Sequence, residues 1–134
     1  MPQLVKGGKW VFGWVLVGPG REMCLPPEAW AEYGFQVGEE AIYLPGSRRS
    51  GGFGLTTPRL MTMLREPMQS ALRVLGRGRF DEEGRLVAPP EVAAKPGERL
   101  LVVRGSGRAL GFVAKGPIYD EALGHPDVQL FGPQ

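Results

Sequence analysis

The sequence predicts a mainly β barrel made of two pseudo-symmetric halves, and three observations lead to this fold class. First, the segment at residues 37–53 is repeated at residues 96–112 with a constant offset of 59. Second, the 21 glycines and 13 prolines fall between short apolar runs, which is typical of tight turns that join short strands. Third, each copy has only about 50 residues, which is marginal for a separate hydrophobic core. The two copies are therefore expected to build one core together.

The repeat extends upstream of this segment. A Gly-Arg pair at residues 20–21 and a Pro-Pro-Glu sequence at residues 26–28 are matched at residues 84–85 and 89–91. Aligning the Pro-Pro-Glu sequences requires an offset of 63, so the second copy has lost four residues before its Gly-Glu pair. The expected organisation is a first copy at residues 1–57, a connector at 58–78 and a second copy at 79–134.

The first copy is expected to contain four strands and one short helix. Aromatic and β-branched residues favour a strand near the start of the copy. Pro26 and Pro27 end the second strand because proline has no amide hydrogen to donate, and Gly34 is a suitable helix stop. The expected elements are strands at residues 9–17, 21–25, 40–44 and 52–55 and a helix at residues 27–33.

The second copy is expected to repeat this order over residues 80–114, with its helix shortened to residues 91–95. A further short helix at residues 116–124 and an extended tail follow it. Ten apolar side chains are expected to form the core of the composite domain. They are Trp14, Leu16, Leu25, Ile42, Leu44, Phe53, Leu86, Leu101, Val103 and Phe112.

The connector is expected to be an amphipathic helix. Thr57 is a suitable N-cap, Pro58 suits the first helical position and Gly76 the C-terminal stop. Apolar residues recur at helical spacing between these ends, and Pro67 predicts a kink. The apolar stripe at residues 58–75 could pack internally or pair two chains in a homo-oligomer.

The composition argues against catalysis, metal binding and membrane insertion. The single histidine, His125, has no nucleophile or carboxylate partner at a recognisable spacing, and the single cysteine, Cys24, lies in an apolar run typical of a buried side chain. No His, Cys, Asp and Glu cluster has metal-ligand spacing. The sequence also lacks a signal peptide or a run of about 20 apolar residues. The expectation is a soluble, cytoplasmic protein that is not an enzyme and carries no cofactor.

Two Gly-Ser loops occupy matching positions, and the first contains Arg48 and Arg49. Backbone amides, hydroxyls and guanidinium groups in one loop are suited to binding a phosphate or a nucleotide. Neither loop has the Gly-Lys-Ser/Thr ending of a phosphate-binding loop, and a glycine-rich hairpin turn explains the same pattern. Both interpretations remain open, and they are compatible if the turn contacts a nucleic acid.

The arginines favour double-stranded DNA as a partner. Arg21 is matched with Arg85, and Arg49 with Arg108. Because a duplex has approximate two-fold axes, symmetric arginines can contact the phosphates or guanine edges of both strands. Residues 58–80 add five arginines against one glutamate, a net charge of +4.

The run of Gly-Arg, apolar strand, Pro, short helix, Gly-Glu and apolar strand resembles the AbrB/MazE/SpoVT swapped-hairpin DNA-binding domain. It spans residues 20–44 in the first copy and residues 84–100 in the second. The resemblance implies interlocked hairpins in a small swapped-hairpin or double-psi-like barrel, and a transcription regulator that contacts DNA through Arg21 and Arg85. One chain would supply both units.

A protein-interaction module is the main alternative. Met61, Met63 and Met68 lie in the connector, and exposed methionines adapt to varied partners. Core packing of these side chains would remove the basis for this alternative.

Overall fold

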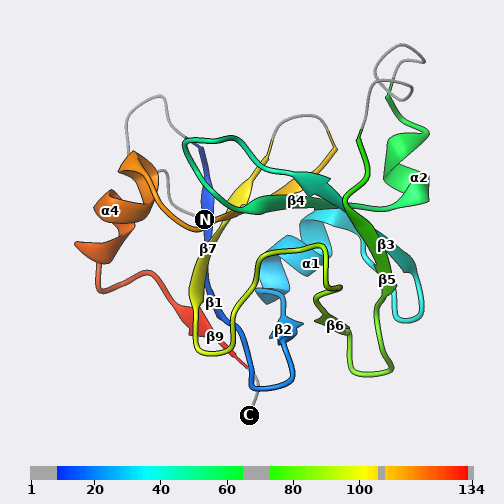
Figure 1. The fold of residues 1–134 in the computed structure, drawn as a ribbon, viewed down its shortest axis with the longest axis horizontal. Helices are drawn as coiled ribbons and strands as arrows, with labels where there is room; N and C mark the ends of the chain where they lie inside the picture. Colours follow the sequence, from blue (N-terminus) through cyan, green and yellow to red (C-terminus); the bar gives the residue numbers. More distant parts are fainter. Residues whose placement is uncertain (1–8, 65–72, 106–107, 133–134) are drawn as a thin grey trace.

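The computed structural model describes residues 9–64, 73–105 and 108–132, and it confirms a mainly β fold with short helices (Figure 1). In chain order the elements are β1 (Val11–Leu16), β2 (Glu22–Cys24), α1 (Pro27–Tyr33), β3 (Glu40–Pro45), β4 (Phe53–Thr56), α2 (Pro58–Met61), β5 (Gly76–Arg79), β6 (Arg85–Val87), β7 (Arg99–Arg104), β8 (Leu110–Val113), α4 (Pro117–Leu123) and β9 (Leu130–Phe131). They follow one another in two similar series: α4 follows β8 as α2 follows β4, α1 has no counterpart in the second series, and β9 is additional.

Seven strands form one mixed sheet in the order β5-β3-β4-β8-β7-β1-β9, and β2 pairs with β6 in a second, two-stranded sheet. Within the described residues β5 and β9 are the edges of the larger sheet and do not pair with each other. The expected barrel is therefore not closed. At one edge β9 extends the sheet by pairing in parallel with β1.

The strand pairing is crosswise between the two halves. β1 pairs with β7, whereas β5 pairs with β3, so the first strand of each half joins the third strand of the other. Equivalent strands also pair directly: Phe53 lies opposite Phe112 in β4 and β8, and Met23 lies opposite Leu86 in β2 and β6. These pairs have the same offsets as the sequence repeat, so a pseudo-two-fold axis passes through both of them.

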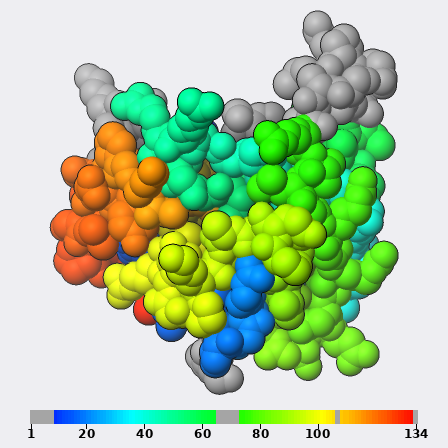
Figure 2. All heavy atoms as spheres, viewed as in Figure 1, coloured from blue at the N-terminus to red at the C-terminus, as the bar shows by residue number. Residues whose placement is uncertain are grey.

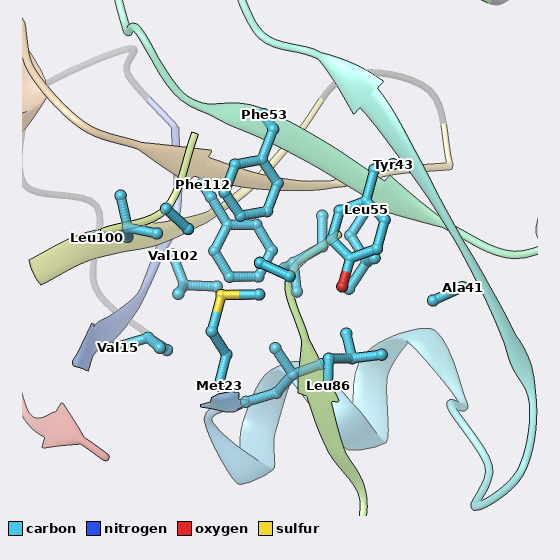
Figure 3. Close-up of a cluster of buried hydrophobic side chains, with 14 of the residues drawn as sticks. Val15, Met23, Ala41, Tyr43, Phe53, Leu55, Leu86, Leu100, Val102 and Phe112 are labelled. Atoms are coloured by element: carbon cyan, nitrogen blue, oxygen red, sulfur yellow. The ribbon is translucent and has the colours of Figure 1, made fainter. Parts of the chain in front are cut away.

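The main core lies between the larger sheet and the layer formed by β2, β6 and α1. Figure 3 shows Phe53 and Phe112 of the sheet pointing toward Met23 and Leu86 of the small one. The two phenylalanine rings are stacked with centroids 4.6 Å apart, and all four side chains are buried. A smaller core on the outer side of the sheet packs α4 against Trp14 of β1 and neighbouring side chains of β7 and β8.

Nine of the ten expected core side chains are buried, and Leu16 is the exception. Leu16 is the last residue of β1 and is only half-buried.

Cys24 is also half-buried, so the expectation of a buried cysteine is only partly met. Burial raises the pKa of its thiol.

The helix start and stop residues of the first half have the expected geometry. Pro27 is the first residue of α1, and Gly34 follows it in the left-handed conformation at φ 65°. The Thr57 hydroxyl accepts the amide of Leu60 at 3.1 Å and so caps α2, with Pro58 in the first turn. These local signals in the sequence are sufficient to define both helix starts.

Two helices predicted from the sequence differ from the structure: one is absent and the other is shorter than expected. Residues 91–95 form the end of a turn and then irregular backbone instead of a helix, and α2 ends at Met61. The predicted continuation of the connector, including Pro67, lies outside the described residues. Gly76 does not stop a helix but begins β5, because Tyr43 and its neighbours in β3 bind this segment as an edge strand. The second half therefore begins at residue 76, within the range expected for the connector.

Candidate functional site

A groove with a volume of 640 Å³ lies on the outer side of the sheet, over its central strands β4 and β8. Figure 1 places α4 and α2 toward opposite ends of this side, with the β3–β4 loop between them. In Figure 2 the β3–β4 loop (teal) stands beside α4 (orange). The apolar residues lining the groove include Leu44, Val103, Val113 and Ile118.

Strand alternation explains why the groove is hollow. Successive side chains of a strand point to opposite faces, and Phe53, Leu55, Leu110 and Phe112 point into the main core. The residues between them on β4 and β8 are glycines, Gly54 and Gly111, which lie directly opposite each other. The centre of the outer face therefore has no side chains, and the groove forms there.

The β3–β4 loop, residues 46–52, is fixed at the rim of this groove. The carbonyl of Ser50 accepts the amides of Ala114 and Lys115, at 2.8 and 3.0 Å. A Cβ at Gly52 would lie 1.7 Å from the carbonyl oxygen of Phe112, so only glycine allows this close approach. The loop is a tight hairpin docked on the segment that leads into α4.

The two hydroxyl groups of this loop are engaged within it. The Ser47 hydroxyl accepts the amide of Ser50 at 3.1 Å, and the Ser50 hydroxyl lies 3.0 Å from that of Ser47. This arrangement matches the hairpin-turn interpretation of the Gly-Ser motif. The anion-binding capacity of the rim therefore rests on its basic side chains.

Four basic side chains line the groove: Lys9, Arg49, Arg73 and Lys115. No aspartate or glutamate is among the described residues that line it. None of the four forms an ion pair or a side-chain hydrogen bond in the described part of the chain. Arg48 and Arg108 are exposed and also without such a partner, and they are adjacent to lining residues of the two loops. We call these six side chains the loop face.

The basic side chains outside the loop face are almost all engaged. Arg59 binds Glu39 at 3.0 Å, Arg77 approaches Glu40 at 3.4 Å, and Arg99 lies over the ring of Trp14. Arg79 donates to a backbone carbonyl, and Arg104 pairs with Glu32. Among the described residues Lys95 is the one unpartnered cation that does not belong to the loop face. Basic side chains that have no partner of any kind among the described residues are therefore concentrated around the groove, whereas Arg21, Arg79 and Arg99 are engaged by carbonyls or a ring.

The structure separates the five arginines that the sequence singled out. Arg48, Arg49 and Arg108 belong to the loop face. Arg21 and Arg85 belong to the β2–β6 layer, on the other side of the main core. The five side chains therefore do not form one site.

Arg21 and Arg85 both have internal partners. Arg21 donates to the carbonyls of Ala94 at 2.9 Å, Pro89 at 3.1 Å and Val92. Arg85 pairs with Asp81 at 3.3 Å and with Glu83 at 3.1 Å, and these carboxylates raise the pKa of its guanidinium group.

The expected match between Arg21 and Arg85 is also corrected by the turn geometry. The amide of Arg21 binds the carbonyl of Gly18, and the amide of Gly84 binds the carbonyl of Asp81 in the same way. Both Arg21 and Gly84 have positive φ, at 63° and 76°. Arg21 is therefore equivalent to Gly84, whereas the Arg49–Arg108 match keeps the offset of 59.

A second, smaller hollow of 300 Å³ adjoins the β7–β8 loop. Arg108 lines it together with Glu32 and Arg104, which pair with each other through Arg104 Nε and Glu32 Oε2 at 2.7 Å. Tyr33 also lines it, and burial raises the pKa of the Tyr33 phenol to about 12. The phenol donates to the carbonyl of Ala109 at 3.0 Å, so its role here is structural.

Sequence reasoning missed Lys9, Arg73 and Lys115. Arg73 was counted in the basic segment at residues 58–80, but nothing indicated its proximity to a Gly-Ser loop. Lys115 has one local signal: it lies two residues after the end of β8, in the segment where the β3–β4 loop docks. The pairing of β4 with β8 brings Lys115 to the β3–β4 loop, and a local sequence pattern does not show that pairing.

Other chemistries have weaker support in the described residues. No group of three His, Cys, Asp or Glu side chains there could hold a metal ion. His125 contacts Glu121 at 3.0 Å on the exposed side of α4. Met61 is half-buried, Met63 is exposed, and Met68 lies outside the described residues. No described helix has the length and apolar character required to cross a membrane.

No family model and no curated protein matches this chain.

Proposed function

We propose that the protein is a DNA-binding regulator that contacts duplex DNA through the loop face. The observation that carries this proposal is that four basic side chains without a partner among the described residues line a groove whose described lining contains no carboxylate. Arg48 and Arg108 lie in the two loops beside it. Phosphate contacts provide most of the affinity in nucleic-acid binding, and they require cations that are not already neutralised within the protein.

The position of the loop face relative to the pseudo-two-fold axis favours a duplex over other polyanions. The axis passes through the Phe53–Phe112 pair beneath the groove. Arg49 and Arg108 are related by the same offset, and their loops lie on opposite sides of the axis. Two cations related by a two-fold can meet equivalent phosphates on the two strands of a duplex.

The crosswise pairing of β1 with β7 and of β5 with β3 supports the resemblance to the AbrB/MazE/SpoVT domain. In the proposed arrangement one chain supplies both interlocked hairpins, and its open edge is extended by β9. The proposed DNA contacts move from Arg21 and Arg85 to Arg49, Arg108 and Arg48, because the first two guanidinium groups already bind carbonyls and carboxylates of the protein.

The test is fluorescence anisotropy with a random-sequence duplex over a series of salt concentrations. We expect affinity to fall steeply with salt, since each phosphate contact contributes about 0.9 to the logarithmic slope. The double variant Arg49→Ala/Arg108→Ala should lower this slope by about 2.

The matched control is Arg77→Ala/Lys95→Ala, which also removes two positive charges but leaves the loop face intact. Its slope should remain that of the unmodified protein. Absence of binding at low salt, or equal losses in the two double variants, would contradict the proposal.

A further inference from the structure

The groove has a property that DNA contact does not require: its floor is apolar and centred on a glycine. Phosphate binding needs only the cations of the rim. The floor contains Leu44, Val103 and Val113, with Gly54 between the side chains of Leu44 and Ala109. An apolar surface in a hollow of 640 Å³ has the size and character of a site for a small organic molecule.

Gly54 is not required by the fold. Its backbone is not in the left-handed region, and an added Cβ would lie 3.5 Å from the Leu44 Cβ and 3.8 Å from the Ala109 Cβ, which are ordinary contacts. By contrast, a Cβ at Gly111 would lie 2.9 Å from Val103 Cγ2, so that glycine is explained by packing. Glycine weakens a strand interior, and its use there marks sites where another group approaches closely.

The rim is suited to the anionic end of such a molecule. Arg49 and Lys115 come from segments that the two hydrogen bonds of Ser50 join, so both cations are held at the same end of the groove. The Lys115 side chain also lies along the loop, with its Cε 3.0 Å from the position of a Cβ on Gly51. Guanidinium and ammonium groups both bind phosphate and carboxylate, and neither of these side chains has a partner among the residues that the structure describes.

We infer that the groove binds an organic anion that joins a phosphate or carboxylate head group to an apolar body. The apolar body lies on the floor over Gly54, and the head group is bound by Arg49 and Lys115. This inference goes beyond DNA binding and does not depend on it, because the apolar floor over Gly54 has no part in the proposed phosphate contacts.

The experiment is calorimetric titration with octyl phosphate and octanoate, each below its critical micelle concentration, against inorganic phosphate and acetate. We expect at least one octyl anion to bind tenfold or more tightly than its head group alone, because only the octyl chain contacts the floor. The comparison between the two octyl anions identifies the preferred head group. Equal affinity for each octyl anion and its head group would overturn the inference.

Gly54→Leu fills the floor and should reduce the affinity for the octyl anion at least tenfold, while the affinity for inorganic phosphate is unchanged. Gly54→Ala, which meets only ordinary contacts, should fold normally and give a smaller loss in the same direction. Val87→Leu, at an exposed position of β6, is the control for added apolar surface. Unchanged octyl affinity in a folded Gly54 variant would also overturn the inference.

The two proposals fail separately. In Gly54→Leu the DNA affinity should be retained, because the rim cations are unchanged. If the protein binds the octyl anions but not DNA, the DNA proposal fails alone. If it binds DNA but not the octyl anions, the organic-anion inference fails alone.

Discussion

The two halves of the molecule stabilise equivalent places in different ways. In the first half α1 places Trp30 against Gly84, which lies in a turn of the second half. A Cβ added to Gly84 would lie 3.2 Å from the nearest atom of the indole ring. In the second half the segment after Pro-Pro-Glu has Ala93 where the first has Trp30, and it forms no helix. There Arg21, the equivalent of Gly84, donates to the carbonyl of Pro89 and to two carbonyls of that segment, those of Val92 and Ala94.

The comparison teaches that a repeated fold does not need repeated interactions. In one place Trp30 of α1 packs against Gly84. In the equivalent place there is no helix, and the Arg21 side chain fills the role of the tryptophan by binding carbonyls. Because strands of the two halves pair crosswise, each solution joins one half to the other. Substitutions at these positions therefore test the composite core more than a local element.

Trp30→Ala should give the largest loss of stability among single changes that distinguish the halves. The indole ring packs edge-on against Phe80 and Phe35, with centroids 5.0 and 5.9 Å away. Its removal should lower the free energy of unfolding by about 3 kcal/mol, measured by urea denaturation. Trp10→Ala, at an exposed tryptophan, should lower it by under about 1 kcal/mol. Equal losses would contradict the role assigned to Trp30.

Arg21→Ala should have the next largest effect. It leaves the carbonyls of Pro89, Val92 and Ala94 without their donor, and the expected loss is about 2 kcal/mol. Arg21→Gly should be less destabilising by about 0.5–1 kcal/mol, because glycine adopts the positive φ of this turn without strain. Urea denaturation measures both. A loss no larger than that of the surface variant Arg77→Ala would contradict a structural role for Arg21.

Tyr43→Phe should increase stability. The Tyr43 hydroxyl is buried and has no hydrogen-bond partner in the described residues, and burial raises the pKa of the phenol (Figure 3). The equivalent position in the second half is Val102, which carries no polar group. Removing the hydroxyl should raise the free energy of unfolding by about 1 kcal/mol.

Tyr33→Phe is the matched control for this prediction, since the Tyr33 hydroxyl donates to the carbonyl of Ala109. It should lower the free energy of unfolding by about 1 kcal/mol. A destabilising Tyr43→Phe substitution would mean that the buried hydroxyl has a partner in solution.

Asp81→Asn should have the smallest effect, and that effect should depend on pH. The Asp81 carboxylate accepts the amides of Arg85 at 2.8 Å and Glu83 at 2.9 Å, and these bonds lower its pKa. Because the folded pKa is below the ordinary value, the stabilisation is present above that value and is lost as pH falls through the folded pKa. The equivalent turn residue in the first half is Gly18, which carries no such group.

The measurement for Asp81→Asn is the urea midpoint at pH 7 and at pH 3. The variant should have a slightly lower midpoint at pH 7, and the difference from the unmodified protein should shrink at pH 3. Glu82→Gln in the same turn is the control. A difference that grows toward low pH would contradict the assigned direction.

Much of the fold could be predicted from local signals. Gly34 and Thr57 mark a helix end and a helix start, and the repeat predicts which strands are equivalent. β5 could not be found in this way, because its sequence alternates glycine and arginine and has no apolar face. It forms a strand because β3 offers a free edge. The open edge at β9 was likewise unpredictable, since it depends on where the tail lies relative to β1.

Of the candidate site, the sequence predicts only the arginines of the two Gly-Ser loops. Arg49 and Arg108 follow from the repeat, but the alignment placed Arg21 opposite Arg85 because both follow a glycine. Backbone hydrogen bonds show that the register is shifted by one residue at this turn. The contributions of Lys9 and Lys115 depend on the tertiary pairing of the strands and not on a motif.

The central claim is that function resides at the loop face and not in the β2–β6 layer. The most direct measurement is mapping of backbone amide chemical shifts in a ¹⁵N-labelled sample titrated with a random-sequence duplex. The claim predicts that the largest changes fall on the loops at residues 46–52 and 105–111 and on Lys115. Changes concentrated at Arg21, Arg85 and their turns would contradict it.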